Sequence, residues 1–454
     1  MSRPVVILCY PKIDHEKDYV YYWMPYSLLA TAQPLLGQDL DVEIFDGNLK
    51  DDSEWESLLE SHKSQDILCI GFSIMTGGGQ IAHALRLARK AKAVVPSVPL
   101  VFGGPHVNVL AEQTSRHELV DAVLSGPGQT SLPKYIDALR GACGFETVPG
   151  LLMNDGERCV KGPPNPPRVQ LLGRYLWQLI EVERYVRDDP TVGRRTLNYI
   201  SSQGCVYKCR FCYELTYQRR YSVVPADTLL EDIRYLVSEF KLDGIKFYDA
   251  DFFINLKRVV RFATSLLDDG PPIAWAASVN PKDIQRAQAF YPDFLRLLKK
   301  SGCSRLLMGV ESGSNRVLQD IVGKEITREE IWKVAQSIAA HDILGSYTFI
   351  VGFPGETETE QNETFKFIEE LWRLQPQPET RVHIFAPYPG TPLFETALQY
   401  GFEPPKSLED WSHYDYYDSQ TPWTNDAIVT RARDYTSMSL SPSVLKPTKA
   451  RRLP

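Results

Sequence analysis

Short apolar runs alternate with longer amphipathic segments along most of the chain, and this alternation is the feature that most restricts the fold. A strand followed by a helix, repeated many times, predicts parallel strands joined by crossover helices. The alternation occurs in two blocks, which are separated by a proline-rich stretch at residues 161–167. So many prolines favour neither a helix nor a central strand, so the stretch predicts a linker.

The first block covers about 140 residues and predicts a doubly wound parallel sheet. Its strands are expected at 5–9, 42–46, 67–72, 100–102 and 122–124, and its helices at 26–36, 55–62, 80–94 and 131–139. Small or polar residues follow the strands at 46–48, 73–79, 103–106 and 126–129. Because ligands of such sheets lie over the carboxyl ends of the strands, these loops predict a broad cofactor that lies against backbone.

The second block begins at Thr196 and predicts an open six-stranded barrel. Strands are expected at 197–201, 244–248, 273–278, 305–310, 346–351 and 381–385, and helices at 226–240, 256–267, 283–300, 328–341 and 358–374. Thr327 and Glu330 have the spacing of a capping box at the fourth helix. Six such units are fewer than the eight of a closed barrel, and functional loops are expected at the strand carboxyl ends.

Four regions follow from this pattern, which is that of an α/β protein. We expect a ligand-binding domain at 1–142, a bridging region at 143–193, the barrel at 194–400, and a C-terminal cap and tail at 401–454. The segment from Pro404 is rich in Asp, Tyr, Ser and Trp, and we expect it to cap the barrel mouth. Residues 446–452 are expected to form a solvated tail.

Composition excludes several classes of protein. Hydrophobic residues make up 43% of the 454 residues and charged residues 24%, which is typical of globular proteins. No apolar run approaches the roughly 20 residues of a membrane-spanning helix. The N-terminal residues resemble a buried strand rather than a signal peptide, so we expect a cytoplasmic protein. The net charge of −7 argues against general nucleic-acid binding.

Three of the eight cysteines are crowded together, at Cys205, Cys209 and Cys212, in a CxxxCxxC pattern. Three thiolates on one loop can hold three irons of a [4Fe–4S] cluster, whose full set of ligands is four cysteines, and the fourth iron stays open to another ligand. A structural zinc ion usually has four Cys or His ligands. No second CxxC occurs, and His383 and His413 are distant in sequence, so the pattern favours the cluster over zinc.

This trio and the segments after the later strands resemble the radical S-adenosylmethionine (SAM) superfamily over residues 196–400. The resemblance implies a [4Fe–4S] cluster on the three cysteines, with SAM bound at its open iron. For Glu311, Asp249 and Asp251 we also weigh a structural carboxylate role. The residues that the resemblance assigns to SAM are Phe211, Tyr248, Asp249, Asp251, Ser278, Asn280, Glu311, Gly352, Phe353 and Pro387.

The first block resembles the cobalamin-binding domain that precedes many radical SAM proteins. The DxHxxG element is absent, which implies that no protein histidine binds cobalt, and Pro127 and Gln129 stand where relatives more often have Glu. His106 could be a ligand, a residue packed on the cofactor edge, or structural. The residues that the resemblance assigns to cobalamin are Ser73, Met75, Thr76, Gly77, Gly103, Gly104, His106, Gly126, Gly128 and Gln129.

Two other interpretations of the first block are considered, of which one stays open and the other is disfavoured. A flavodoxin-like module without a ligand is the structural alternative, because doubly wound folds host many functions. A nucleotide-binding domain is disfavoured, since the glycines at 77–79 are not a GxGxxG motif and no Walker lysine follows a glycine loop.

Together the two resemblances imply a cobalamin-dependent radical SAM enzyme. The expected activity is methylation of an unactivated carbon through methylcobalamin and a 5′-deoxyadenosyl radical. The alternatives are a cyclase or another enzyme that forms or rearranges C–C bonds, and a non-catalytic iron–sulfur or corrinoid sensor. The expected partners are a small-molecule substrate and an electron donor such as flavodoxin or ferredoxin. The sequence assigns no catalytic residue and no particular substrate.

Overall fold

The computed structural model of the protein describes residues 3–13, 23–154, 159–165, 175–217, 220–375, 379–414 and 421–439. These residues form two compact units. The first unit takes its residues from Met1–Tyr185, Thr216–Ser222 and Glu403–Tyr416, and the second from Val186–Leu215, Val223–Phe402 and Tyr417–Pro454. The tail expected at 446–452 and the last two prolines of the 161–167 stretch lie outside the described residues.

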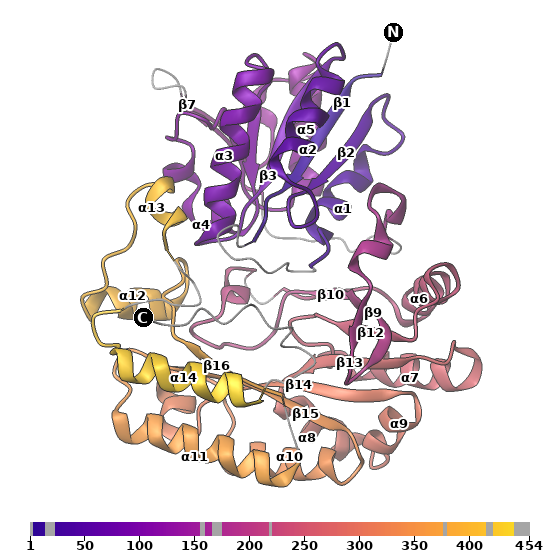
Figure 1. The fold of residues 1–454 in the computed structure, drawn as a ribbon, viewed down its shortest axis with the longest axis vertical. Helices are drawn as coiled ribbons and strands as arrows, with labels where there is room; N and C mark the ends of the chain where they lie inside the picture. The colour runs from indigo at the N-terminus through magenta and orange to yellow at the C-terminus, as the bar shows by residue number, and fades with distance from the viewer. Residues whose placement is uncertain are drawn as a thin grey trace. The chain divides into compact units, whose positions relative to one another are not determined.

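The first unit contains the expected doubly wound sheet, in the strand order β2–β1–β3–β4–β5–β6–β7 (Figure 1). The first five strands pair in parallel, and the last two pair antiparallel at one edge. The bounds are β1 (Val5–Tyr10), β2 (Asp41–Asp46), β3 (Ile67–Ser73), β4 (Leu100–Gly103), β5 (Ala122–Leu124), β6 (Leu151–Asn154) and β7 (Cys159–Lys161). The hairpin β6–β7 is an addition to the prediction, because it lies in the region assigned to a bridge.

Helices cover both faces of this sheet. The helices α2, α3 and α4 contribute to one core with β1, and Trp55 and Phe102 are completely buried there. The other helices, α1 and α5, pack on each other and also contact β1 and β3. Their bounds are α1 (Tyr26–Ala32), α2 (Asp52–His62), α3 (Gly79–Val94), α4 (Pro105–Thr114) and α5 (Gly128–Leu139). The helix expected at 26–36 is therefore shorter, and Gln33–Leu35 form a 3-10 turn.

The helix α4 corrects one sequence-based prediction. The sequence predicts a loop at residues 103–106, but Pro105 begins α4 and His106 lies in its first turn. Proline is favoured at this position because the first helical N–H groups have no partner within the helix. The Gly-Gly-Pro sequence is compatible both with a turn and with a helix start, and here it serves as the helix start.

The described part of the segment expected to cap the barrel mouth packs on the first unit. Its short helix α13 (Leu408–Ser412) contacts α3, and Trp411 is buried in the same core as Trp55. The Gly78 backbone N–H donates to the Trp411 carbonyl at 3.0 Å, and the Gln113 amide donates to the Pro405 carbonyl at 3.3 Å. Residues 415–418 of this segment lie outside the described residues.

The second unit contains the six expected parallel strands and one additional antiparallel edge strand. Its order is β16–β15–β14–β13–β12–β9–β8, in which only β8 runs antiparallel to its neighbour. The bounds are β8 (Arg187–Asp189), β9 (Gly193–Tyr199), β12 (Gly244–Phe247), β13 (Ala274–Val279), β14 (Cys303–Glu311), β15 (Leu344–Val351) and β16 (Glu379–Ile384). A separate two-stranded sheet consists of β10 (Ser202–Gln203) and β11 (Ser222–Val223).

Four of the five helices expected in this block are confirmed, and α12 and α14, which follow the last strand, are additions to the prediction. The helix bounds are α6 (Ala226–Phe240), α7 (Leu256–Asp269), α8 (Pro281–Phe290), α9 (Phe294–Lys300), α10 (Arg328–Ala339), α11 (Glu358–Leu374), α12 (Pro392–Gln399) and α14 (Asp426–Ser439). The Thr327–Glu330 capping box is confirmed. The prediction of a single helix at 283–300 is wrong, because two helices, α8 and α9, cover this stretch. Because proline disfavours a helical residue before it, Tyr291 leaves the helical conformation (φ −134°, ψ 88°) ahead of Pro292, and α8 ends before α9 begins.

Ion pairs across the sheet show that it is strongly curled. The Asp189 carboxylate on β8 lies 2.8 Å from Lys246 Nζ on β12 and 3.7 Å from an Arg305 nitrogen on β14. Since neighbouring strands are about 4.8 Å apart, a flat sheet would separate β8 and β14 by roughly 19 Å. The side chains therefore meet because the sheet closes toward a half-barrel. The helices α8, α10 and α11 lie side by side along it (Figure 1).

Within the described part of the chain, no helix has the length and apolar character that crossing a membrane requires.

The packing of Trp411 gives a stability prediction. Replacement of this side chain, which is 1% exposed, by alanine leaves a cavity in the first unit, and we expect a loss of about 3–5 kcal/mol in its free energy of unfolding. Urea unfolding followed by circular dichroism measures this loss. The control Leu36→Ala removes a side chain that is 45% exposed and should change stability by less than about 0.5 kcal/mol. Equal unfolding midpoints for the two variants would contradict the packing described.

Candidate functional site

The three cysteines lie on one loop that two other segments hold. The Arg210 backbone N–H donates to the Val322 carbonyl at 2.7 Å, and the Leu393 N–H donates to the Arg210 carbonyl at 3.1 Å. The loop is therefore fixed between the β14–α10 connection and the start of α12. The Cys212 N–H donates to the Cys209 carbonyl at 3.0 Å and closes a turn between two of the cysteines.

Asp249 anchors the chain just before the cysteine loop. Its carboxylate accepts hydrogen bonds from the Ser201 N–H at 2.6 Å, the Ser201 hydroxyl at 2.5 Å and the Ser202 N–H at 3.1 Å. An Arg258 nitrogen also donates to the Ser201 hydroxyl oxygen at 2.6 Å. Burial raises the pKa of Asp249, against the effects of Arg258 and these hydrogen bonds. The carboxylate that the resemblance assigns to SAM thus holds the start of the cysteine loop.

Asp251 forms a buried pair with another carboxyl group. Its oxygens accept from the Phe253 N–H at 2.8 Å and the Asn280 N–H at 3.1 Å. Burial raises the pKa of Asp251 well above its ordinary value, and the adjacent Asp283 raises it further. Tyr207, on the cysteine loop, lies near this pair: burial raises its pKa, and the charge of Asp283 raises it further. The pair therefore connects the carboxyl ends of β12 and β13 to the cysteine loop.

Glu311 combines backbone strain with a buried ion pair. Its φ of 71° lies in the left-handed region, which costs a non-glycine residue about 1–3 kcal/mol and persists only where the surroundings hold it. Lys324 Nζ lies 3.0 Å from Glu311 Oε1 and also donates to the Gly309 carbonyl. Burial acts to lower the pKa of Lys324, but Glu311, Cys209 and Asp251 together raise it, and the net shift is upward. Lys324 is not among the residues predicted from the sequence, because thirteen positions separate it from its partner.

Aromatic rings and a buried glutamate meet where β15 ends. The Phe211 ring centroid lies 6.1 Å from that of Phe353, which lies 5.2 Å from that of Phe385. Glu356 Oε2 accepts from the Gly352 N–H at 2.5 Å and the Phe353 N–H at 3.1 Å. Glu356 therefore fixes the backbone of two residues that the resemblance assigns to SAM, although it was not predicted.

The remaining predicted SAM residues also lie where strands end. Tyr248 and Ser278 are half-buried, and Pro387 is buried in the loop after β16. Asn280 caps α8, with its side chain accepting from the Lys282 N–H at 3.0 Å. Parallel pairing places all of these residues at one edge of the sheet, together with the cysteine loop.

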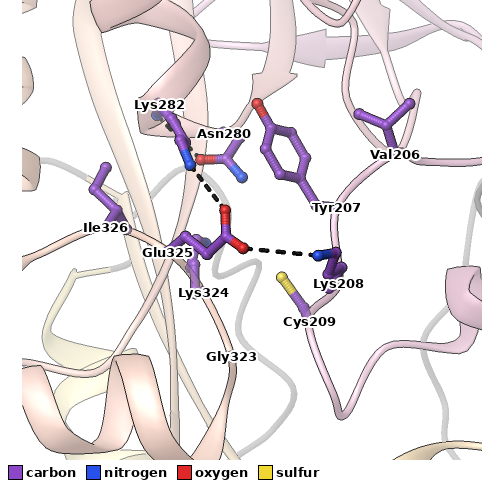
Figure 2. A pocket seen from close by; sticks show the side chains of 10 residues that line it. All are labelled: Val206, Tyr207, Lys208, Cys209, Asn280, Lys282, Gly323, Lys324, Glu325 and Ile326. Atoms are coloured by element: carbon purple, nitrogen blue, oxygen red, sulfur yellow. Dashed lines mark hydrogen bonds and ion pairs between the residues drawn. The ribbon is translucent and has the colours of Figure 1, made fainter.

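A pocket of about 180 Å³ opens beside Cys209 (Figure 2). It brings one cysteine together with Asn280 and with the ion-paired Lys324. Its lining residues are Val206, Tyr207, Lys208, Cys209, Asn280, Lys282, Gly323, Lys324, Glu325 and Ile326.

The cysteine loop fits an iron–sulfur cluster. All three cysteines are partly exposed as residues, and burial raises the pKa of Cys205 to about 12, so cluster binding must displace thiol protons. Within the described residues, no three His, Cys, Asp or Glu side chains converge as they would around a single metal ion. In a cluster each thiolate binds a different iron, which does not require such convergence.

The predicted cobalamin residues lie at the carboxyl ends of β3, β4 and β5. Two of them carry buried polar atoms without a hydrogen-bond partner among the described residues, namely the Thr76 hydroxyl and both ring nitrogens of His106. Buried polar groups are normally paired, so these atoms fit a ligand that is rich in polar groups. The others are Ser73, Met75, Gly77, Gly103, Gly104, Gly126, Gly128 and Gln129.

Two of these glycines are required by contacts within the chain. Gly77 has a φ of 89°, and a Cβ there would lie 3.1 Å from the Tyr414 carbonyl oxygen. Gly104 has a φ of 96°, and a Cβ would lie 2.7 Å from the Ile74 carbonyl oxygen. The sequence predicts these glycines for close approach of cobalamin, and the structure shows close approach of other residues of the chain at both.

His106 is completely buried. Its ring centroid lies 5.8 Å from the Trp411 ring, in an edge-to-face arrangement. Burial lowers the pKa of His106 to about 3, so the imidazole is neutral. The sequence places Trp411 only in a C-terminal cap, because nothing in its local sequence indicates a partner about three hundred residues earlier.

The Lys324–Glu311 pair yields a second prediction. Lys324→Met leaves the Glu311 carboxylate buried without its cation, and we expect a loss of about 3–5 kcal/mol in unfolding free energy. The double variant Lys324→Met/Glu311→Gln should recover most of that loss, because neither charge remains. Urea unfolding of the single and double variants measures the coupling, with the exposed Lys333→Met as control. Additive losses in the double variant would show that the pair is not coupled.

Glu356 gives a pH-dependence prediction. Burial raises its pKa to about 7 from an ordinary 4.5. The folded state therefore binds this proton more tightly than the unfolded state, so stability falls as pH rises from about 4.5 to about 7, by roughly 3 kcal/mol. Glu356→Gln should remove that fall, and exposed Glu358→Gln should not. Unfolding midpoints at several pH values measure the slope. Parallel slopes for all three proteins would contradict the expectation.

Comparisons with known proteins agree with this architecture. Residues 18–136 match the B12 binding domain and residues 199–368 match the radical SAM superfamily. A protein of Pyrococcus horikoshii named as an uncharacterized methyltransferase is 28% identical over 425 residues, which cover 92% of this chain and 88% of that protein. The anaerobic magnesium-protoporphyrin IX monomethyl ester cyclase of Cereibacter sphaeroides is 26% identical over 313 residues, 67% of this chain but only 49% of the cyclase, so the chain spans about half of that relative.

A solved structure supports the fold. The radical SAM methyltransferase TsrM from Kitasatospora setae, with cobalamin and a [4Fe–4S] cluster bound, superposes with a TM-score of 0.68 at 18% identity, covering 88% of this chain and 78% of that chain. The two matched domains occur in the order expected from the sequence. The chain thus combines a B12-binding domain with a radical SAM domain that follows it along the sequence.

Proposed function

We propose that the protein is a cobalamin-dependent radical SAM enzyme that methylates an unactivated carbon of a small molecule. The observation that carries the proposal is the cysteine loop, fixed at the carboxyl-end edge of a half-barrel in a chain that also has a B12-binding domain. Residues 1–142 would hold cobalamin and residues 194–400 would hold the cluster and SAM. The TsrM structures with cobalamin, a cluster, tryptophan and a SAM analogue support this assignment by likeness of fold.

The chain's own residues would hold and shield the cofactors. Cys205, Cys209 and Cys212 would bind three irons, with the loop orientation fixed by Asp249. When bound, a [4Fe–4S] cluster supplies a low-potential electron for SAM cleavage and cobalamin supplies a methyl carrier. The curled sheet encloses the space over its concave face, which would exclude water from reactive species.

Residues at the strand ends whose conformations are fixed by neighbouring side chains would position SAM. Glu311 is kept in one strained conformation by Lys324, and Gly352 and Phe353 are fixed by Glu356. Fixed groups lose little freedom when a ligand binds, so such preorganisation supports orientation of the reacting bonds. The electron would come from a carrier of the flavodoxin or ferredoxin class in the cytoplasm.

The cofactor content tests the proposal directly. After anaerobic reconstitution with iron, sulfide and hydroxocobalamin, we expect four irons and one cobalt per chain. Cys209→Ala should lose the cluster and SAM cleavage but keep cobalamin, whereas Cys159→Ala, which removes an exposed thiol, should keep all three. Iron without cobalt in the parent protein would refute the cobalamin-dependent function.

Product analysis separates methylation from its alternative. Methylation should yield 5′-deoxyadenosine and S-adenosylhomocysteine in equal amounts, with a methyl mass increment in the substrate. The cyclase relative makes ring formation the second candidate. A turned-over substrate without the methyl increment and without S-adenosylhomocysteine would favour ring formation.

A further inference from the structure

A group of positive side chains surrounds the mouth of the pocket beside Cys209. Lys208 and Lys282 expose 58% and 43% of their side chains, and the stem of Arg210 lies across Gly323. Val206, an exposed apolar residue, stands next to them. We call Val206, Lys208, Arg210, Lys282 and Glu325 the loop patch. In a chain with a net charge of −7, this local positive charge is unlike the molecule as a whole.

Glu325 is the one carboxylate within the loop patch. Its oxygens lie 3.1 Å from Lys282 Nζ and 3.9 Å from Lys208 Nζ, as the dashed lines in Figure 2 show. Exposed ion pairs of this kind contribute at most about 1 kcal/mol, so both lysines can turn toward another partner. Three cations against one carboxylate leave the loop patch with two net positive charges.

The loop patch is built on the cysteine loop itself. Lys208 and Arg210 are the two sequence neighbours of Cys209, and Val206 follows Cys205. Lys282 and Glu325 come from the segments that line the same pocket as Cys209. A protein seated on the loop patch would therefore lie against the part of the loop that carries two cluster ligands.

We propose that the loop patch docks a small acidic one-electron carrier of the ferredoxin or flavodoxin class. This inference rests on the proposed function, which needs an external electron for each SAM cleavage. The step is balanced by one electron: the reduced carrier is oxidised by one electron, and the oxidised cluster on the three cysteines is reduced by it. An exposed apolar residue beside charged side chains suits such a transient interface, because the charges steer the encounter.

Charge reversal tests the proposal with a reduced acidic ferredoxin as probe. At low salt, Lys208→Glu and Lys282→Glu should each slow cluster reduction by roughly tenfold or more, and Glu325→Gln should accelerate it. Lys333→Glu, exposed on α10, is the matched control. Stopped-flow absorbance and electron paramagnetic resonance follow the reduction. In about 0.5 M salt the differences should shrink, because the charges are then screened.

Reduction by titanium citrate serves as the reference for each variant. It needs no docking, so variants with intact clusters should be reduced at the parent rate. Equal rates with ferredoxin for the parent protein, the lysine reversals and Glu325→Gln would overturn the docking proposal while leaving the enzyme proposal intact.

Ferredoxin binding to the cluster-free chain, measured by calorimetry, distinguishes the two proposals. If no cluster forms, the proposed function fails. The docking surface is then still supported by binding that Lys282→Glu weakens and Glu325→Gln strengthens. It is refuted by binding that neither substitution changes, or by the absence of binding.

Discussion

Parallel strand pairing is the constraint on which both units depend. It places the carboxyl ends of successive strands at one edge, so residues separated by up to two hundred positions come together without any local signal. In the second unit the cysteine loop, the Asp251–Asp283 pair, Glu311 and the Gly352 turn all follow strands of one sheet. In the first unit the loops after β3, β4 and β5 meet in the same way. The location of each site follows from the topology, and the side chains supply its chemistry.

The curl of the second sheet depends on charges that cross its concave face. Arg305 pairs with Glu379 at 2.8 Å as well as with Asp189, and both acidic groups have a lowered pKa because the neighbouring cations outweigh burial. Burying such a network is costly unless every charge is paired. The strand β8, which supplies Asp189, lies in the bridging region, for which the sequence predicts no element, so the closing contact of the half-barrel was not foreseen.

The features that could be predicted from the sequence are those with a local signal. The six parallel strands, the two blocks of alternation and the Thr327–Glu330 capping box depend on residues within a few positions of one another, and all are confirmed. The prediction fails at Pro105, where the same residues are compatible with a loop and with a helix start. It also fails at Pro292, which interrupts an otherwise helical pattern. Lys324 and Trp411 are missed for a different reason, because each acquires its role from a tertiary contact. Glu356 instead accepts from backbone N–H groups three and four positions earlier, a local contact that the residue pattern does not announce. The functional roles of the predicted SAM and cobalamin residues stay predictions, although their placement at the strand ends agrees with them.

Two opposing requirements meet on the cysteine loop. Under the proposed function, the radical chemistry would need a dry, enclosed space, whereas each electron would arrive from another protein at the surface. The loop can satisfy both because its two sides differ. Phe211 packs on Phe353, the completely buried residue after β15. Val206 and Lys208, on the same loop, are exposed or half-exposed. Within this short loop the sequence therefore changes from solvent-facing to core-facing residues around Cys209 and Cys212. If the proposed function holds, this change would let one loop connect an external reductant to a shielded reaction space.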